Sequence, residues 1–177
     1  MTPFEIIALI RQEVKPALGC TEPIAVALAV AKAVEIISDN CSCCDKAWRL
    51  KAALRIDVAV SGNILKNGMG VGIPGTGMVG LPVAAALGAV CGDSSKGLEV
   101  LSGLTPRAVE RAKELVAQGC IHISVADTPH LLYVKATVAV EDGTVASAEV
   151  DPHAFVIIQD SHQILGEGFA KNSKTAL

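Results

Sequence analysis

The uncharged segment from Gly68 to Gly92 constrains the fold of this chain more than any other feature. It runs for 25 residues without Asp, Glu, Lys or Arg, and it contains eight glycines and two prolines. A bilayer crossing needs roughly 20 apolar residues, but glycine and proline at this density would leave backbone groups unpaired in lipid. The segment therefore predicts a glycine loop followed by a buried core helix, from Met78 on, rather than a membrane span.

Length and charge narrow the class of protein. A chain of 177 residues suffices for one domain with a full core, which we expect over 1–165, with a flexible tail over 166–177. A net charge of −3 offers no basic surface excess, so nucleic acid and anionic membranes are not expected partners. The N-terminus alternates charged and apolar residues, unlike a secretion signal, which predicts a cytoplasmic protein whose six cysteines are reduced or bind metal.

Hydrophobic periodicity predicts an α+β fold, with N-terminal helices and a glycine-loop helix packed on a small, mainly antiparallel sheet. Between the second helix and the first strand, residues 38–48 are polar and predict a loop. Thr21 and Thr105 are the expected N-caps of two of the helices. The predicted helices cover 3–14, 21–37 and 106–118, and the predicted strands cover 50–60, 120–126, 130–140, 144–150 and 153–160.

Cys20, in the stretch KPALGCTEP, occupies an unusual position for a cysteine. It precedes a long apolar helix, whereas a structural cysteine normally lies inside the apolar run. A thiolate at a helix N-terminus is stabilised by the helix dipole and by free N–H groups. Nucleophiles and soft metal ions both require thiolates, so local chemistry leaves both roles open for Cys20.

The glycine loop contains G-x-G-x-x-G twice, which raises the possibility of a dinucleotide fold. That fingerprint must follow a strand directly and be followed by an acidic residue after a second strand, and neither condition is met here. Glycine N–H groups could instead cradle an anion such as a carboxylate, or serve only tight turns. Ser61, Asn63, Lys66 and Asn67, just before the loop, could bind an amino acid or simply turn the chain.

The other cysteines and the histidines carry weaker signals. The group Cys41, Cys43 and Cys44 lacks a second pair at zinc-site spacing, so its role stays open. Cys91 and Cys120 lie among apolar residues and are expected to pack. Of the four histidines, His153 in DPHAF is the one expected at a turn.

Two long motifs resemble a known family. VKPALGCTEPIAVALAVAKA (14–33) and SGNILKNGMGVGIPGTGMVGLPVAAALGA (61–89) resemble the N-terminal part of the L-cysteine desulfidase family, which is related to the alpha chain of iron-sulfur L-serine dehydratases. The resemblance runs from about residue 10 to 125. It implies a lyase with a 4Fe-4S cluster that eliminates sulfide from L-cysteine and releases pyruvate and ammonia. Three thiolates hold such a cluster, and one iron stays open as a Lewis acid.

The resemblance also assigns residues. Cys20 matches one cluster ligand, and Ser61, Asn63, Asn67, Gly75, Thr76 and Gly77 are the expected substrate-contacting loop. The family's other two cluster cysteines lie in a C-terminal half with no counterpart here. We therefore expect this chain to be inactive alone and to work with a complementary C-terminal subunit or as a homo-oligomer.

Further points bear on the catalytic residue and on rival functions. Where the family shows Gly-Gly-His-Thr-Asn, DPHAF keeps only His153, the one candidate catalytic residue. An L-serine dehydratase-type lyase would share the cluster and differ in the leaving group. A non-enzymatic amino-acid-binding or regulatory module would keep the glycine loop without a cluster.

Overall fold

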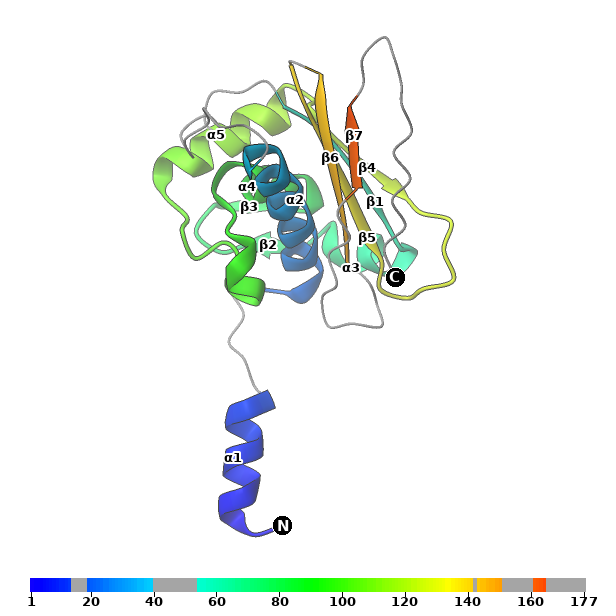
Figure 1. Ribbon diagram of the computed structural model, residues 1–177. Coiled ribbons are helices and arrows are strands. Elements are labelled where there is room, and N and C mark those ends of the chain that lie inside the picture. Colours follow the sequence, from blue (N-terminus) through cyan, green and yellow to red (C-terminus); the bar gives the residue numbers. More distant parts are fainter. Residues whose placement is uncertain (14–18, 40–53, 142, 151–160, 165–177) are drawn as a thin grey trace.

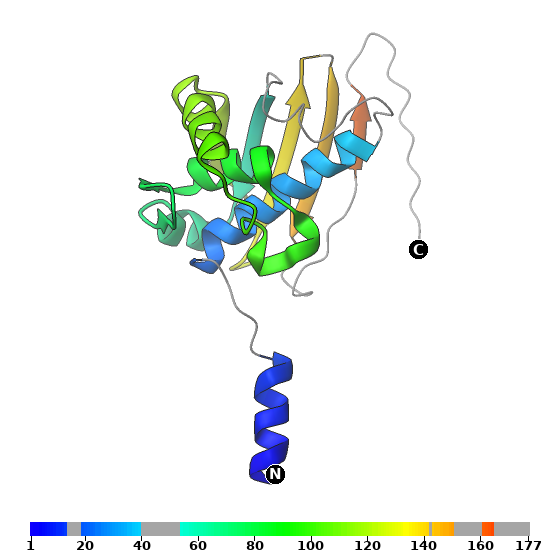
Figure 2. The same ribbon diagram turned by 90° about the vertical axis from the view of Figure 1, so that its left-hand side faces the viewer.

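The computed structural model describes residues 1–11, 19–39, 54–141, 143–150 and, for the backbone alone, 12–13 and 161–164. It confirms the α+β fold: helices cover one face of a sheet (Figures 1 and 2). Five strands form this sheet in the order β4-β1-β5-β6-β7, and a separate two-stranded hairpin pairs β2 with β3. The main sheet comprises β1 (Leu54–Val60), β4 (Ile121–Val125), β5 (Val134–Val140), β6 (Thr144–Val150) and β7 (Ser161–Ile164).

The main sheet is mixed, with antiparallel pairs predominating. β1 pairs antiparallel with β5, and β6 pairs antiparallel with both β5 and β7. β4 instead runs parallel to β1, with Ile56 beside Ile121 and Val58 beside Ile123. A parallel neighbour requires a crossover, and the whole segment from residue 61 to 120 forms that connection.

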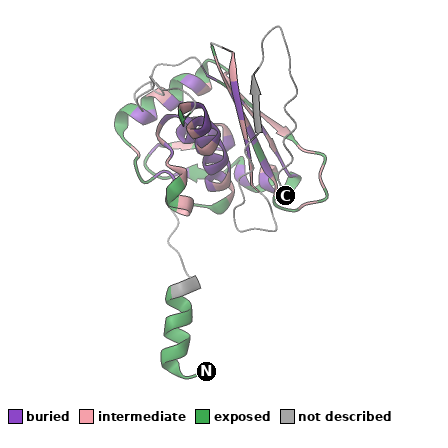
Figure 3. Cartoon of the chain, viewed as in Figure 1, coloured by how far each residue is buried: buried purple, intermediate pink, exposed green. Residues whose placement is uncertain are grey.

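Two apolar helices form the centre of the core. α2 (Thr21–Asp39) packs on α4 (Leu81–Cys91) and on strands β5 and β6. α4 consists almost wholly of Ala, Val, Leu and Gly, and nine of its 11 residues are buried. A helix that is apolar on every side must be surrounded by protein, as Figure 3 shows for α2. Within the described ranges, none of the helices combines the length and apolarity that a bilayer crossing requires.

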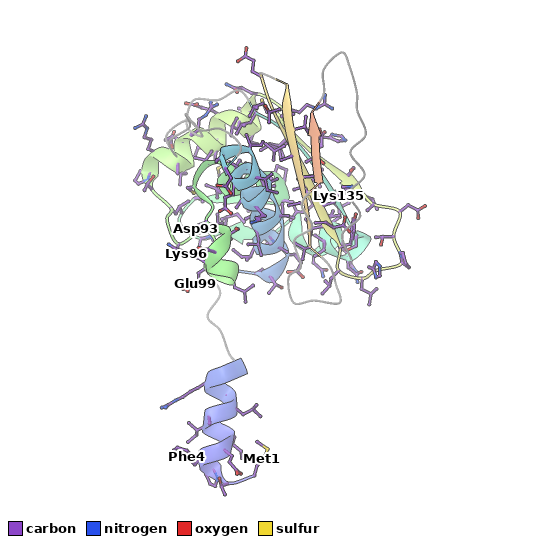
Figure 4. All side chains as sticks on the ribbon, viewed as in Figure 1. Met1, Phe4, Asp93, Lys96, Glu99 and Lys135 are labelled. Carbon is purple, nitrogen blue, oxygen red and sulfur yellow. The ribbon has the colours of Figure 1, made fainter. Side chains whose placement is uncertain are left out.

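The helix α5 (Pro106–Ala117) was predicted closely. Thr105 precedes it, and its hydroxyl accepts a hydrogen bond from the Ala108 N–H at 3.2 Å, as an N-cap should. The short 3₁₀ helix η2 (Ser94–Glu99), which carries Lys96 and Glu99 in Figure 4, was not predicted. It is tied to α2 through Glu35, whose carboxylate accepts from the backbone N–H of Ser94 at 2.8 Å and from the Ser94 hydroxyl.

Three sequence predictions need correction. The stretch after β1 forms a helix, α3 (Gly62–Gly68), where the sequence predicted only the end of the strand. The glycine loop contains the hairpin of β2 (Gly72–Ile73) and β3 (Met78–Val79), which was not predicted. The helix α4 begins at Leu81, the first residue of the apolar run LPVAAALGAV that was expected to be helical after the loop, and not at Met78, the earliest expected start. The N-cap of α2 is Cys20 rather than the expected Thr21, because the Cys20 carbonyl accepts the first helical hydrogen bond, from the Ile24 N–H.

The predicted strand over 153–160 and the predicted tail over 166–177 lie outside the described residues. The prediction of one domain over 1–165 stays a prediction.

The N-terminal helix α1 (Pro3–Glu13) was predicted and stands apart from the rest of the chain (Figures 1 and 3). The residues of α1 from 3 to 11 are exposed, and Met1 and Phe4 project into solvent (Figure 4). An isolated helix of 11 residues is marginally stable in water. The apolar side of α1, with Ile7 and Ile10, is therefore uncovered in the isolated chain.

The chain's one tyrosine leads to a prediction about pH. Burial, followed by the charge of Glu149 and a hydrogen bond with it, raises the pKa of the Tyr133 phenol. The unfolded chain then loses this proton first, so the neutral phenol favours the folded state fully below about pH 10 and progressively less above it. We expect Tyr133→Phe to reduce the alkaline fall in the free energy of unfolding, measured by urea denaturation across this range. Equal pH profiles for the two proteins would contradict the prediction.

Candidate functional site

Cys20 is exposed at the start of α2, next to the glycine hairpin. The preceding residue, Gly19, has a φ of 113°, and a Cβ atom added to it would lie 3.3 Å from Cδ of Pro74. Both the backbone angle and this close approach favour glycine at the position. The sequence Gly-Cys thus places an accessible thiol beside the tip of the hairpin.

Glu22 joins this turn to α3. Its carboxylate accepts a hydrogen bond from the Asn67 side-chain amide at 3.3 Å and one from the Thr21 hydroxyl at 3.4 Å. Asn63 lies four residues before Asn67 and is exposed, so the two amides share one face of α3. The structure therefore brings Asn67 to the turn that carries Cys20, although 45 residues separate Asn67 from Glu22 in the sequence.

The hairpin tip is built from the Gly-Thr-Gly triplet. Gly75 and Gly77 have φ values of 78° and 68°, which residues with a Cβ rarely adopt. Thr76 lies between them and is buried; its hydroxyl donates to the Ile73 carbonyl at 2.7 Å and accepts from the Met78 N–H at 3.0 Å. The hydroxyl therefore closes the hairpin, and the two glycines present exposed backbone.

Thr76→Val tests this local role. The substitution keeps the shape of the side chain but leaves the Met78 N–H and the Ile73 carbonyl without the hydroxyl, at a loss of about 1–3 kcal/mol in unfolding free energy. Urea denaturation followed by circular dichroism measures the change. Thr137→Val is a matched control, because its hydroxyl bonds only the Ser147 hydroxyl in a half-buried position on the sheet. Equal losses for the two variants would contradict the assigned role.

Ser61 differs from the other residues predicted to contact substrate. It is only 2% exposed, and its hydroxyl donates to the Leu131 carbonyl at 2.8 Å and accepts from the Tyr133 N–H at 3.3 Å. These bonds hold the entry of β5 to the end of β1. A substrate role for Ser61 stays a prediction, and its hydroxyl is already engaged with this backbone.

A pocket of about 450 Å³ lies between the hairpin tip and the first turns of α5. Gly75 and Thr76 line it from the hairpin, and Glu110 and Lys113 line it from α5. The remaining lining residues are Leu104, Thr105, Pro106 and Val109. No sequence motif indicated that α5 lines a pocket, although the helix itself was predicted, with Thr105 as its N-cap.

The metal-binding side chains that the structure describes are dispersed. Cys91 and Cys120 are half-buried, as packing residues are, and the Cys91 thiol donates to the Leu87 carbonyl. Among the described residues, no three His, Cys, Asp or Glu side chains gather closely enough to hold a metal ion. His153, Cys41, Cys43 and Cys44 lie outside the described residues.

Fold and site together define an α+β domain with an accessible thiol at a helix start, next to a glycine hairpin. No family model matches the chain. It is 46% identical over 166 residues to the UPF0597 protein of Shewanella halifaxensis, a match that covers 93% of this chain and 37% of that protein. The corresponding protein of Parabacteroides distasonis is 50% identical over 131 residues, covering 74% of this chain and 28% of the relative. The chain thus spans about a third of the length of the curated relatives it matches.

Proposed function

We propose that this chain is the N-terminal part of an iron-sulfur lyase that eliminates sulfide from L-cysteine. The observation that carries the proposal is the exposed Cys20 thiol at the start of α2, beside the hairpin tip and the Glu22–Asn67 contact. This elimination breaks the Cα–H and Cβ–S bonds of cysteine, gives the proton to a base, and releases sulfide. Water then converts the remaining enamine to pyruvate and ammonia.

The donor chemistry at Cys20 fits one ligand of a 4Fe-4S cluster. Its thiol is open to solvent, and the positive end of the α2 dipole favours both an anionic thiolate and a negatively charged cluster. When bound, a cluster with one open iron supplies Lewis-acid polarisation of the leaving sulfur. A cluster of this kind needs three protein thiolates, so two further ligands would come from outside the residues described here.

The other residues at this corner have positioning roles in the proposal. Glu22 joins α3 to the turn of Cys20 through Asn67, and Asn63 lies one turn before Asn67 on the same helix. The exposed backbone of Gly75 and Gly77 offers N–H groups to a carboxylate. Substrate binding and the cluster ligand would thus be held on neighbouring elements: the start of α2, the helix α3 and the hairpin.

The test adds the part of a longer relative to which this chain has no match. The chain is co-expressed with the part of the Shewanella halifaxensis relative that it does not match, and the complex is reconstituted anaerobically with iron and sulfide. We expect cluster absorbance in the visible range and release of pyruvate from L-cysteine. Faster release from L-serine would favour a dehydratase instead. A complex that forms but takes up no iron would contradict the proposal.

A further inference from the structure

The pocket between the hairpin and α5 has charged groups of both signs on one helix. Glu110 and Lys113 lie one turn apart, and the Lys113 Nζ and Glu110 Oε1 atoms are 2.7 Å apart. Their side chains are 69% and 45% exposed, respectively. An exposed pair of this kind adds little to stability, so a ligand can separate the two charges at small cost.

The rest of the pocket is apolar or uncharged. Leu104, Pro106 and Val109 supply apolar surface, and Thr76 and Thr105 use their hydroxyls to close the hairpin and to cap α5. A volume of about 450 Å³ lies within the range of small-molecule sites. The pocket therefore has space for a small apolar or thiol side chain beside the charged pair.

Charge selects the class of ligand. A simple anion near Lys113 would also meet the carboxylate of Glu110, and a simple cation would meet the ammonium of Lys113. A ligand that carries one charge of each sign a few ångströms apart can satisfy both groups at once. A free amino acid has this arrangement, with its α-carboxylate and α-ammonium on one carbon.

We propose that this pocket binds a small zwitterionic amino acid, with Lys113 bonding the ligand carboxylate and Glu110 bonding its ammonium. The proposal rests on the proposed function only in taking L-cysteine as the first ligand to test. Gly75 and Thr76 form the hairpin side of the pocket and belong to the predicted substrate loop. Glu110 and Lys113 add a specificity-determining pair that no sequence motif indicated.

Calorimetric titration of the 177-residue chain under reducing conditions tests the ligand class. L-Cysteine is compared with cysteamine, which lacks the carboxylate, and with 3-mercaptopropionate, which lacks the ammonium. We expect saturable binding of L-cysteine and affinities lower by about tenfold or more for each analogue, the scale of one charge-assisted hydrogen bond. Absence of saturable L-cysteine binding, or equal affinity for all three ligands, would overturn the proposal.

Substitutions of Glu110 and Lys113 test whether the amino acid binds in this pocket. Lys113→Met and Glu110→Gln should each weaken L-cysteine binding by about tenfold, and Lys113→Met should not weaken cysteamine further, because that ligand has no carboxylate to lose. Glu114→Gln is the control, since it removes one carboxylate from the same helix outside the pocket lining, where Glu114 pairs with Arg111 at 2.9 Å. Binding that is unchanged in both pocket variants would place the ligand elsewhere and overturn the proposal.

The two proposals fail separately. The pocket is tested by titration without a cluster, whereas the lyase is tested by iron uptake and pyruvate release. Charge-dependent binding in a protein that takes up no iron would support the pocket and count against the lyase.

Discussion

Gly88→Ala is expected to destabilise this protein strongly, although it adds a single methyl group. A Cβ atom at Gly88 would lie 2.4 Å from the carbonyl oxygen of Ala27 and 2.9 Å from its Cα. These are backbone atoms of α2, so no side chain can rotate away, and the two helices must move apart. Overpacking of this kind costs about 1–3 kcal/mol, and the rigidity of the contact places Gly88 at the upper end.

The measurement is urea denaturation followed by circular dichroism. The midpoints are compared between proteins whose unfolding free energies have the same slope against urea concentration. Gly62→Ala is the control, because nothing lies within 4 Å of a Cβ atom added in this exposed first turn of α3. There alanine should leave the unfolding free energy unchanged or raise it by up to about 1 kcal/mol through helix propensity and chain entropy. Equal midpoints for the two variants would show that α2 and α4 do not approach as closely as described.

Cys20→Ser is expected to prevent cluster assembly in the co-expressed complex. A serine hydroxyl keeps the size of the side chain but is not the soft thiolate that iron-sulfur clusters bind. Iron content and visible absorbance should fall to the level of a protein without a cluster, and pyruvate release should be lost with them. The unfolding free energy should not fall, because Cys20 is exposed, and serine at this N-cap position should raise it by up to about 1 kcal/mol.

Cys120→Ser is the control for Cys20→Ser, because it removes a thiol that is not a proposed cluster ligand. Cys120 is half-buried just before β4, and its thiol lies 3.8 Å from Oε1 of Gln118. This variant should keep the cluster. Iron content that is the same in the Cys20 variant, the Cys120 variant and the unsubstituted complex would remove Cys20 from the ligand set. A nucleophilic role for the thiol would then have to be tested by alkylation in the presence and absence of L-cysteine.

Local signals predicted the long elements of the fold. Continuous apolar runs indicated α2 and α4, and the capping Thr105 with an amphipathic stripe indicated α5. These signals act between residues a few positions apart. The same signals were ambiguous for short elements: α3 has seven residues, two of them glycine, and each strand of the hairpin has two residues. Propensity over so few residues does not outweigh glycine, so tertiary packing decides these elements.

Part of the candidate site also follows from local sequence, and part depends on tertiary packing. The position of Cys20 at a helix start follows from its neighbours in the sequence. The Glu22–Asn67 contact spans 45 residues, and the pocket joins the hairpin at 75–76 to the start of α5 and the two residues before it. Neither arrangement leaves a periodic or spaced pattern, because each depends on how α2, the hairpin and α5 are placed around α4.

Apolar periodicity and helix-end preferences are local properties of the chain, and they were enough to predict the α+β class, the buried helix pair and a thiol at a helix start. Tertiary packing was needed to fix the parallel pairing of β1 with β4, the hairpin within the glycine segment, and the placing of Gly75, Glu110 and Lys113 around one pocket. The physical reason is packing: Gly88 lets α2 and α4 approach to backbone contact, and the elements around that contact are positioned by shape rather than by any local preference.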